Sequence, residues 1–309
     1  MTKVEPSTGR VGSPPHRRRF TRKRWRGAGF LLPFLIPFAL FYIAPIAYAV
    51  WESLFRLVRP EGIFGKPQLV FAGLSQYGDV LANPDFRDGI GRVLIFAAIQ
   101  IPVVIVLAVT LVLALDSSRA RFPRFFRLAY FVPYAVPTVV STILWGSLYS
   151  PDLSPLGAVG LHVSFLNAQL VIFAIANIGI WTYCGYNVMV LHSALQSIPL
   201  EIYEAARIDG AGEFAIAWRI KLPLLRNALI LIAVFSIIGT LQLFTEPQIM
   251  RSISTAITTT YTPSMLAYSV ASNNQYNAAA AISVSLAAAT FVLSFGFLKL
   301  AQGRGWQSL

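Results

Sequence analysis

The sequence predicts an all-α integral membrane protein with six transmembrane helices. Of its 309 residues, 56% are hydrophobic and only 12% are charged, whereas a soluble domain carries about 25% charged residues. A transmembrane helix needs about 20 mostly apolar residues, and six segments of this kind follow one another along the chain. This composition excludes an ordinary water-soluble domain.

Each predicted span is an apolar run between more polar connections. The spans should be helical, because a bilayer offers no partner for unpaired backbone groups. Prolines inside them, such as Pro102, Pro133 and Pro137, predict kinks that neighbouring helices must cover. The expected spans are residues 29–51, 92–115, 128–149, 168–193, 227–248 and 278–300.

Positive charge lies mainly on one side of these spans. Nine of the 25 Lys and Arg residues fall within residues 1–27, directly before the first span. With the N-terminus inside, 19 of the 25 lie in the inner segments and 6 on the outer side. Because inner loops are enriched in Lys and Arg, both termini are predicted to be cytoplasmic.

The expected domain organisation is simple. Residues 1–27 form a disordered basic cytoplasmic leader, 28–300 a six-helix membrane domain, and 301–309 a cytoplasmic tail. No repeat of fixed period and no second soluble domain is evident in the sequence.

The chain shows no chemical means of driving transport by itself. No acidic residue falls in the middle of a predicted span; only Glu246 comes close, near the outer end of the fifth. His16, His162 and His192 are scattered without metal-ligand spacing, and no phosphate-binding loop is present. The sequence therefore predicts no metal site, no catalytic site and no cofactor in this chain, so active transport would need a partner that supplies the energy.

The inner segment 194–226 is the most informative stretch. Ser197 is expected to cap a helix that runs to Ile208, followed by a turn at 209–212 and a second helix over 213–220. From the residues alone, two interpretations stay open. The first helix could dock into a groove of a partner, or it could be an amphipathic helix that lies passively on the bilayer.

Seven residues of this segment form a spaced motif: Glu204, Ala205, Ala206, Gly210, Ile220, Leu222 and Pro223. The motif resembles the signature of the permeases of ATP-binding-cassette (ABC) importers, which is E-A-A, three residues, G, nine residues and then I-x-L-P. The flanking sequence is similar to the carbohydrate branch, specifically the first of its two permease types, which is maltose or glycerol-3-phosphate permease-like. Arg92 departs from that branch, which often has asparagine there.

This resemblance implies the type I ABC importer permease fold in a bacterial plasma membrane. It implies that the inner helix couples the chain to an ATPase. The implied partners are a second permease subunit, two ATPase subunits that bind ATP and Mg, and an extracytoplasmic solute-binding protein. The chain itself would be a transport subunit and no enzyme. The implied coupling residues are Glu204, Ala205, Ala206, Arg207, Asp209 and Gly210.

Polar and aromatic side chains in the fourth and fifth spans are candidates for the substrate pathway. Thr182 and Tyr186 are four residues apart and share a helical face, as do Ser236 and Thr240. Such residues also pack helix against helix in membranes, and this alternative stays open. By position relative to a similar maltose permease, the resemblance implies a pathway of Gly179, Thr182, Tyr183, Tyr186, Ser236, Gly239 and Thr240.

The resulting hypothesis is a permease subunit that imports a mono- or oligosaccharide, driven by ATP hydrolysis in its partners. Import of glycerol-3-phosphate is the alternative within the class, although the absence of Lys and Arg from the middle of the spans favours a neutral sugar. A stand-alone secondary carrier or channel is the alternative from another class. A membrane-embedded enzyme would need a catalytic cluster that the sequence does not show.

Overall fold

The computed structural model describes residues 31–58, 60, 66–117, 121–150, 154 and 163–303. The predicted leader and residues 304–309 of the predicted tail lie outside this part of the chain, as do His16 and His162. The chain separates into two compact units, Met1–Tyr48 and Ala49–Leu309. The domain boundaries expected from the sequence stay predictions.

The described part of the first unit is helical. A helix over 31–38 continues into the π-helical turn η1 (Ala39–Ile43) and then α2 (Ala44–Glu52), which runs across the boundary between the units. The π-helical turn lies between Pro37 and Pro45, which cannot donate backbone hydrogen bonds. The apolar segment Leu31–Glu52 is long enough to cross a membrane, in agreement with the first predicted span.

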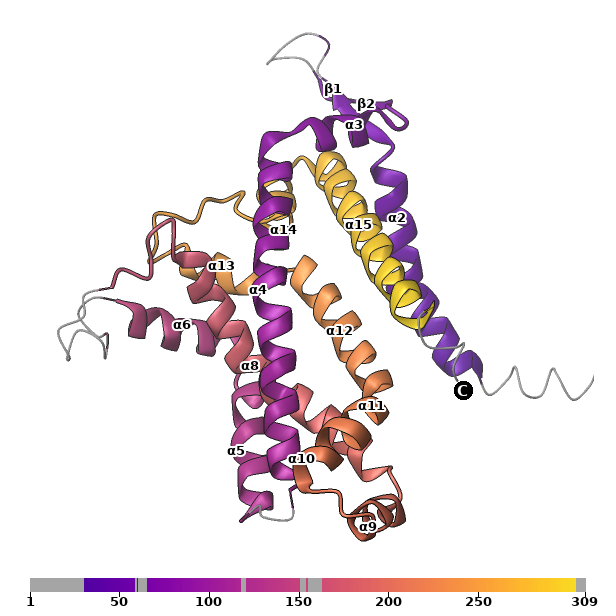
Figure 1. The fold of residues 1–309 in the computed structure, drawn as a ribbon. Helices are drawn as coiled ribbons and strands as arrows, with labels where there is room; N and C mark the ends of the chain where they lie inside the picture. The colour runs from indigo at the N-terminus through magenta and orange to yellow at the C-terminus, as the bar shows by residue number, and fades with distance from the viewer. Residues whose placement is uncertain are drawn as a thin grey trace, which may run out of the picture. The chain divides into compact units, whose positions relative to one another are not determined.

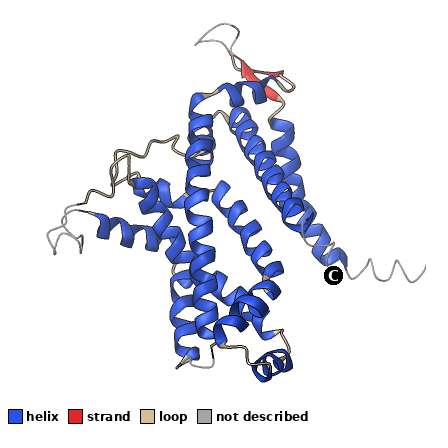
Figure 2. Cartoon of the chain, viewed as in Figure 1, coloured by secondary structure: helices blue, strands red, loops and turns tan. Residues whose placement is uncertain are grey.

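The second unit is built mainly of helices (Figures 1 and 2). Its long helix α4 (Pro84–Leu115) runs between a β-hairpin at one end and the short helix α9 at the other (Figure 1). The other elements are β1 (Phe55–Val58), β2 (Gln68–Phe71), α3 (Ser75–Ala82), α5 (Pro123–Ala135), α6 (Thr138–Tyr149), α8 (Val171–Gln196), α9 (Leu200–Ile208), α10 (Glu213–Ile216), η3 (Ala217–Lys221), α11 (Leu222–Leu224), α12 (Arg226–Leu241), α13 (Thr245–Met250), α14 (Pro263–Ser272) and α15 (Tyr276–Gly303).

The third predicted span is not one straight helix. Among the described residues, five helical segments are long and apolar enough to cross a membrane, and the pair α5 and α6 makes a sixth only if both count as one bent span. These two helices meet at an angle of 93°. Val136 is extended because its neighbour Pro137 disfavours helical backbone at the preceding residue. The prediction of a helix over 128–149 was therefore wrong at this break, where proline ends the helix instead of kinking it.

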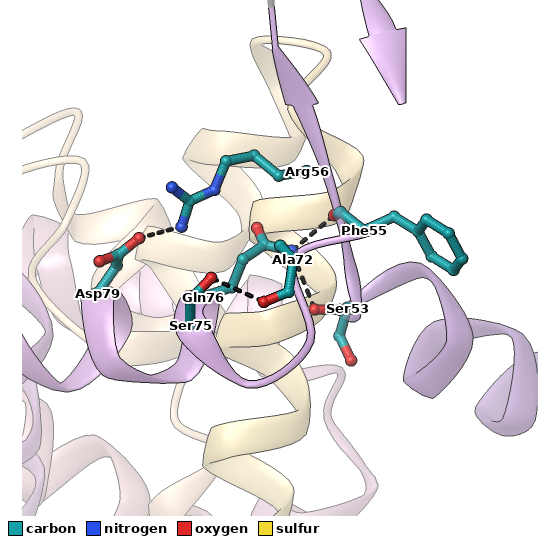
Figure 3. Close-up of polar contacts among 7 residues, drawn as sticks. All are labelled: Ser53, Phe55, Arg56, Ala72, Ser75, Gln76 and Asp79. Atoms are coloured by element: carbon teal, nitrogen blue, oxygen red, sulfur yellow. Dashed lines mark hydrogen bonds and ion pairs between the residues drawn. The ribbon is translucent and has the colours of Figure 1, made fainter. Parts of the chain in front are cut away.

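The all-α prediction also missed a small β-hairpin. β1 and β2 pair antiparallel, with Phe55 opposite Phe71. The buried side chain of Gln76 on α3 holds this hairpin, because its Nε2 donates hydrogen bonds to the carbonyl oxygens of Ser53 at 2.9 Å and Phe55 at 2.6 Å (Figure 3). The strands are only four residues long and lie in a polar connection, which is why the hydropathy pattern did not reveal them.

Arg92, which departs from the family pattern, joins α4 to the segment before α14. Its guanidinium lies 5.0 Å from the ring centroid of Tyr261 and donates a hydrogen bond to the Tyr261 carbonyl oxygen at 3.3 Å. Such a cation–π contact stabilises the positive charge at the end of the helix.

The core of the second unit forms around α8, which packs against α4 and α5. Ile175 and Ile178 of α8 are fully buried in one apolar cluster with Met265, and Leu191 lies in a second cluster with Leu225. Burial of these side chains fixes the helices that enclose the cavity described below.

A glycine allows the closest approach between α5 and α8. A Cβ atom on Gly185 would lie 1.7 Å from the carbonyl oxygen of Tyr130. Small residues at helix interfaces let backbones approach in this way, and in a membrane such packing replaces the hydrophobic driving force. Backbone atoms cannot move aside as a flexible side chain can, so any larger residue at this position must push α5 and α8 apart.

Gly185→Ala is expected to destabilise the folded chain by about 1–3 kcal/mol, because overpacking forces the helices apart. The measurement is thermal unfolding of the purified protein in detergent. Gly91→Ala is the matched control, since a Cβ there meets no heavy atom within 4 Å and alanine favours a helix. Equal melting temperatures for the two variants would contradict the close contact.

Candidate functional site

A cavity of about 330 Å³ lies among the helices of the second unit. It is formed where α4, α8 and α12 face one another, with the end of α5 and the start of α13 completing the wall. Aromatic, hydroxyl and amide side chains predominate in the lining. The residues that line it are Phe96, Gln100, Val104, Tyr134, Thr138, Tyr183, Tyr186, Asn187, Phe235, Ser236, Gly239, Thr240, Gln242, Leu243, Phe244, Thr245 and Glu246.

The structure brings most of the predicted pathway residues to this cavity. Tyr183 and Tyr186 come from α8, and Ser236, Gly239 and Thr240 come from α12. The Ser236 and Thr240 face of α12 therefore meets Tyr183 and Tyr186 of α8 across one space, whereas Thr182, which was expected on the face of Tyr186, does not line it.

Gly179 and Thr182 do not line the cavity. A Cβ atom on Gly179 would lie 2.3 Å from Nε2 of Gln100, so this glycine makes room for the α4 side chain. Thr182 is buried, and its hydroxyl has no hydrogen-bond partner among the described residues. The packing alternative stays open for both residues, and their place in the substrate pathway stays a prediction.

Three tyrosines form an aromatic wall. The ring of Tyr134 stacks on Tyr186 with centroids 4.9 Å apart, and lies 6.3 Å from the ring of Tyr183. Tyr134 belongs to the last turn of α5, next to the break at Val136. The sequence analysis missed Tyr134 because its position depends on a bend that hydropathy cannot show.

Two further polar groups were also missed as members of the site. Gln100 is 7% exposed and accepts a hydrogen bond of 3.5 Å from the Thr240 hydroxyl. Glu246 is equally buried, in the first turn of α13. A lone glutamine within an apolar span was a usable signal, because polar side chains inside membranes are costly and tend to be functional. The cavity wall, in the part of the chain that the structure describes, contains no Lys or Arg.

The second candidate region is the inner segment around α9. Gly210 follows this helix with a φ of +80°, a left-handed conformation that side chains other than glycine rarely adopt. The amide of Ala211 donates to the carbonyl of Ala206 at 2.9 Å, which closes the helix end. The predicted cap at Ser197 was wrong, because its hydroxyl donates to Ala194 in the preceding helix and α9 starts only at Leu200.

The predicted coupling residues form an exposed surface. Glu204, Ala205, Arg207, Asp209 and Gly210 are exposed, and Ala206 is half-buried. Large apolar side chains extend this surface, because Ile208 is 86% and Phe214 82% exposed. An ion pair of 3.2 Å between Arg207 and Glu213 joins α9 to α10. We call the surface formed by 204–210 and Phe214 the α9 surface.

No group of three or more His, Cys, Asp or Glu side chains that could hold a metal ion occurs in the described ranges.

Residues 70–305 match the family described as the binding-protein-dependent transport system inner membrane component. The chain belongs to this family of ABC transport permeases. It is accordingly a transport subunit, and its apolar helices make it a multi-pass membrane protein.

Known proteins similar to this permease include two transport subunits and a solved complex. The trehalose/maltose transport system permease protein MalF of Thermococcus litoralis is 30% identical over 290 residues, covering 89% of this chain and 92% of that protein. The sn-glycerol-3-phosphate permease UgpA of Escherichia coli O6:K15:H31 (strain 536 / UPEC) is 30% identical over 211 residues, covering 66% and 69%.

The solved structure is a chain of a bacterial alginate ABC transporter in complex with an alginate pentasaccharide-bound periplasmic protein. It superposes with a TM-score of 0.75 at 19% identity and covers 89% of this chain and 93% of that chain. At this identity, the likeness shows that the permease has the fold of an ABC importer subunit.

The Trp side chain of the Gly239→Trp variant is expected to fill the cavity. Uptake of the transported substrate by the reconstituted complex should be abolished, while the melting temperature of the protein stays unchanged. A Cβ atom there meets nothing within 4 Å, so the indole enters open space. Gly296→Trp is the control, because Gly296 is equally open and lies on α15 away from the cavity. Uptake by the Gly239 variant at the level of the control would exclude the cavity as the pathway.

Proposed function

We propose that this permease is one of two membrane subunits of a bacterial ABC importer that carries a neutral sugar across the plasma membrane. ATP hydrolysis in partner subunits docked on the α9 surface would drive the transport. The observation that carries the proposal is the exposure of the E-A-A residues at one end of the same unit that encloses a polar, aromatic cavity.

The proposed topology has six spans and cytoplasmic termini. In this topology, the bent pair α5 and α6 counts as the third span. Support comes from the Lys and Arg bias of the connecting segments. It also comes from the placement of the β-hairpin and α9 at opposite ends of α4 (Figure 1), since the hairpin belongs to a proposed outer segment and α9 to an inner one.

The chemistry of the cavity favours a neutral sugar over glycerol-3-phosphate. Sugar hydroxyls need hydrogen-bonding partners, which Gln100, Ser236 and Thr240 supply, and an apolar sugar face packs on aromatic rings such as those of Tyr183 and Tyr186. A phosphate group needs cationic donors. The described cavity wall has none, and the one acidic side chain in it, Glu246, offers a phosphate no cationic partner.

The proposed complex contains a second permease subunit, two ATPase subunits and an extracytoplasmic solute-binding protein. Six spans make about half of a pore, which is why a second permease is required. ATP and Mg would bind to the ATPase subunits, and the permease would hold neither a cofactor nor an ATPase site of its own.

Glu204→Lys and Gly210→Val are expected to lower co-purification of an ATPase subunit at least about tenfold, as for central residues of an interface. The first reverses a charge on the α9 surface, and the second places a β-branched residue at φ +80°. The measurement is a pull-down from native membranes in mild detergent, with partners identified by mass and the complex assayed for ATP hydrolysis.

The control for this pull-down is Gly212→Ser. Gly212 has a φ of −73° and precedes α10, and serine suits that cap position. A stable complex without any ATPase subunit, together with uptake by the chain alone in vesicles without ATP, would contradict the importer and indicate a secondary carrier.

A transport assay tests the substrate class. The co-purified complex is reconstituted in vesicles with ATP on the α9 side and the solute-binding protein on the other. ATP-dependent uptake is expected for a neutral sugar from a radiolabelled panel of maltose, trehalose and lactose. Glycerol-3-phosphate should not be taken up, and its ATP-dependent accumulation would contradict the neutral-sugar proposal.

A further inference from the structure

A buried lysine lies where η3, the end of α4 and α9 meet. Lys221 is only 4% exposed. Its Nζ lies 2.6 Å from Oδ2 of Asp116 and donates a hydrogen bond of 3.2 Å to the Asp116 carbonyl oxygen. The same ammonium group lies 5.2 Å from the ring centroid of Tyr203. We call these three residues the lysine contact.

Lys221 is the last residue of a π-helical turn. Residues Ala217–Lys221 form this turn, η3, and π-helical turns inside helices often occur at functional positions. Lys221 is buried, whereas Arg219 two residues earlier is exposed, because side chains two residues apart lie on opposite sides of a helix.

The lysine contact joins the α9 surface to the cavity. Tyr203 is the buried residue of α9. Asp116 is the C-cap of α4, and the same helix supplies Gln100 to the cavity wall. Lys221 itself ends the turn that leads through α11 into α12, the helix of Ser236 and Thr240.

Tyr203 contributes its aromatic ring, and not its hydroxyl group, to the lysine contact. Its hydroxyl is buried and has no hydrogen-bond partner among the described residues. Burial raises the pKa of Tyr203 above its usual value, and the nearby charge of Asp116 raises it further. The phenol is therefore neutral at physiological pH, and its π face is what the ammonium group meets.

The ion pair is buried on the lysine side, whereas the Asp116 side chain is 24% exposed. Such a pair contributes little net stability, because removing the ammonium group from water costs about as much as the attraction returns. Its geometry is nevertheless strict, because the buried ammonium group cannot be left without its partner. The contact therefore adds little to the stability of the fold, but it can transmit a displacement of α9 to the end of α4.

We propose that Lys221 is a positioning residue that transmits movement of the α9 surface to the cavity helix α4 through Asp116 and Tyr203. The inference rests on the proposed coupling function of α9. Loss of the contact leaves the permease folded and able to hold its ATPase, but ATP hydrolysis no longer moves the cavity wall.

The deciding variant is the double substitution Lys221→Met/Asp116→Leu. It removes both charges, so that no uncompensated charge stays buried and the fold is retained. In reconstituted vesicles, ATPase co-purification should be kept while the amount of transported sugar per ATP hydrolysed falls about tenfold, as for a lost interaction of about 1.4 kcal/mol in the transport step. The probe is the radiolabelled sugar that the unaltered complex takes up. An unchanged ratio would overturn the proposal.

A control and a matched pair make the test specific. Arg56→Met breaks the ion pair with Asp79, which is exposed on both sides and should leave the ratio unchanged. Tyr203→Phe should also leave the amount of sugar transported per ATP unchanged, because the aromatic ring is kept. Tyr203→Leu should lower this amount, since leucine cannot make a cation–π contact with the ammonium group. Equal effects of the two Tyr203 variants would overturn the assignment of the ring.

A second measurement does not depend on the ATPase. A nitroxide is attached to Ile208→Cys, which is exposed on α9, in a chain whose single cysteine is replaced by Cys184→Ala. The label should become more mobile in the Lys221→Met/Asp116→Leu chain than in the Arg56→Met chain. Unchanged mobility would refute the lysine contact as a positioning device, whereas absence of any ATPase from the unaltered complex would refute only the proposed importer.

Discussion

The close packing of α8 against α4 and α5 is the constraint on which the cavity depends. Lipid tails are as apolar as the helices, so association relies on backbone approach at small residues. Gly185 lets α8 lie directly against the carbonyl of Tyr130, and Gly179 makes room for Gln100. With α8 held on both sides, Tyr183 and Tyr186 face the same space as the polar residues of α12. The cavity is the consequence of two tight contacts.

The break between α5 and α6 adds the aromatic wall. Non-helical backbone at membrane depth is tolerated only where protein or a cavity satisfies it. Here the extended residue Val136 directly follows the turn that carries Tyr134 to the cavity. Pro137, which would destabilise an isolated membrane helix, ends α5 at the cavity and redirects the chain into α6. Pro133 lies inside α5.

Charge is distributed unevenly along α4. Its middle supplies Gln100 to a cavity wall without cations in the described residues. Its end carries Asp116, which is paired with the buried Lys221. A neutral or weakly acidic cavity is compatible with polyhydroxyl substrates, and the ion pair holds the end of the helix where the α9 surface is anchored. The helix α4 thus connects the α9 surface, where the ATPase would dock, with the cavity, through which the substrate would pass.

The sequence alone determined the membrane class, five of the apolar spans and the family, because hydropathy over about 20 residues and the spacing from Glu204 to Pro223 are local properties. It also indicated the polar face of α12, since Ser236 and Thr240 are four residues apart and both line the cavity. Only the tertiary structure decided that Gly179 makes room for the Gln100 side chain, that Tyr134 reaches the cavity, and that Lys221 is buried beside Asp116. The first and third depend on a partner from another helix, and the second depends on the 93° bend between α5 and α6. Partners that are distant in sequence are fixed only when the helices pack.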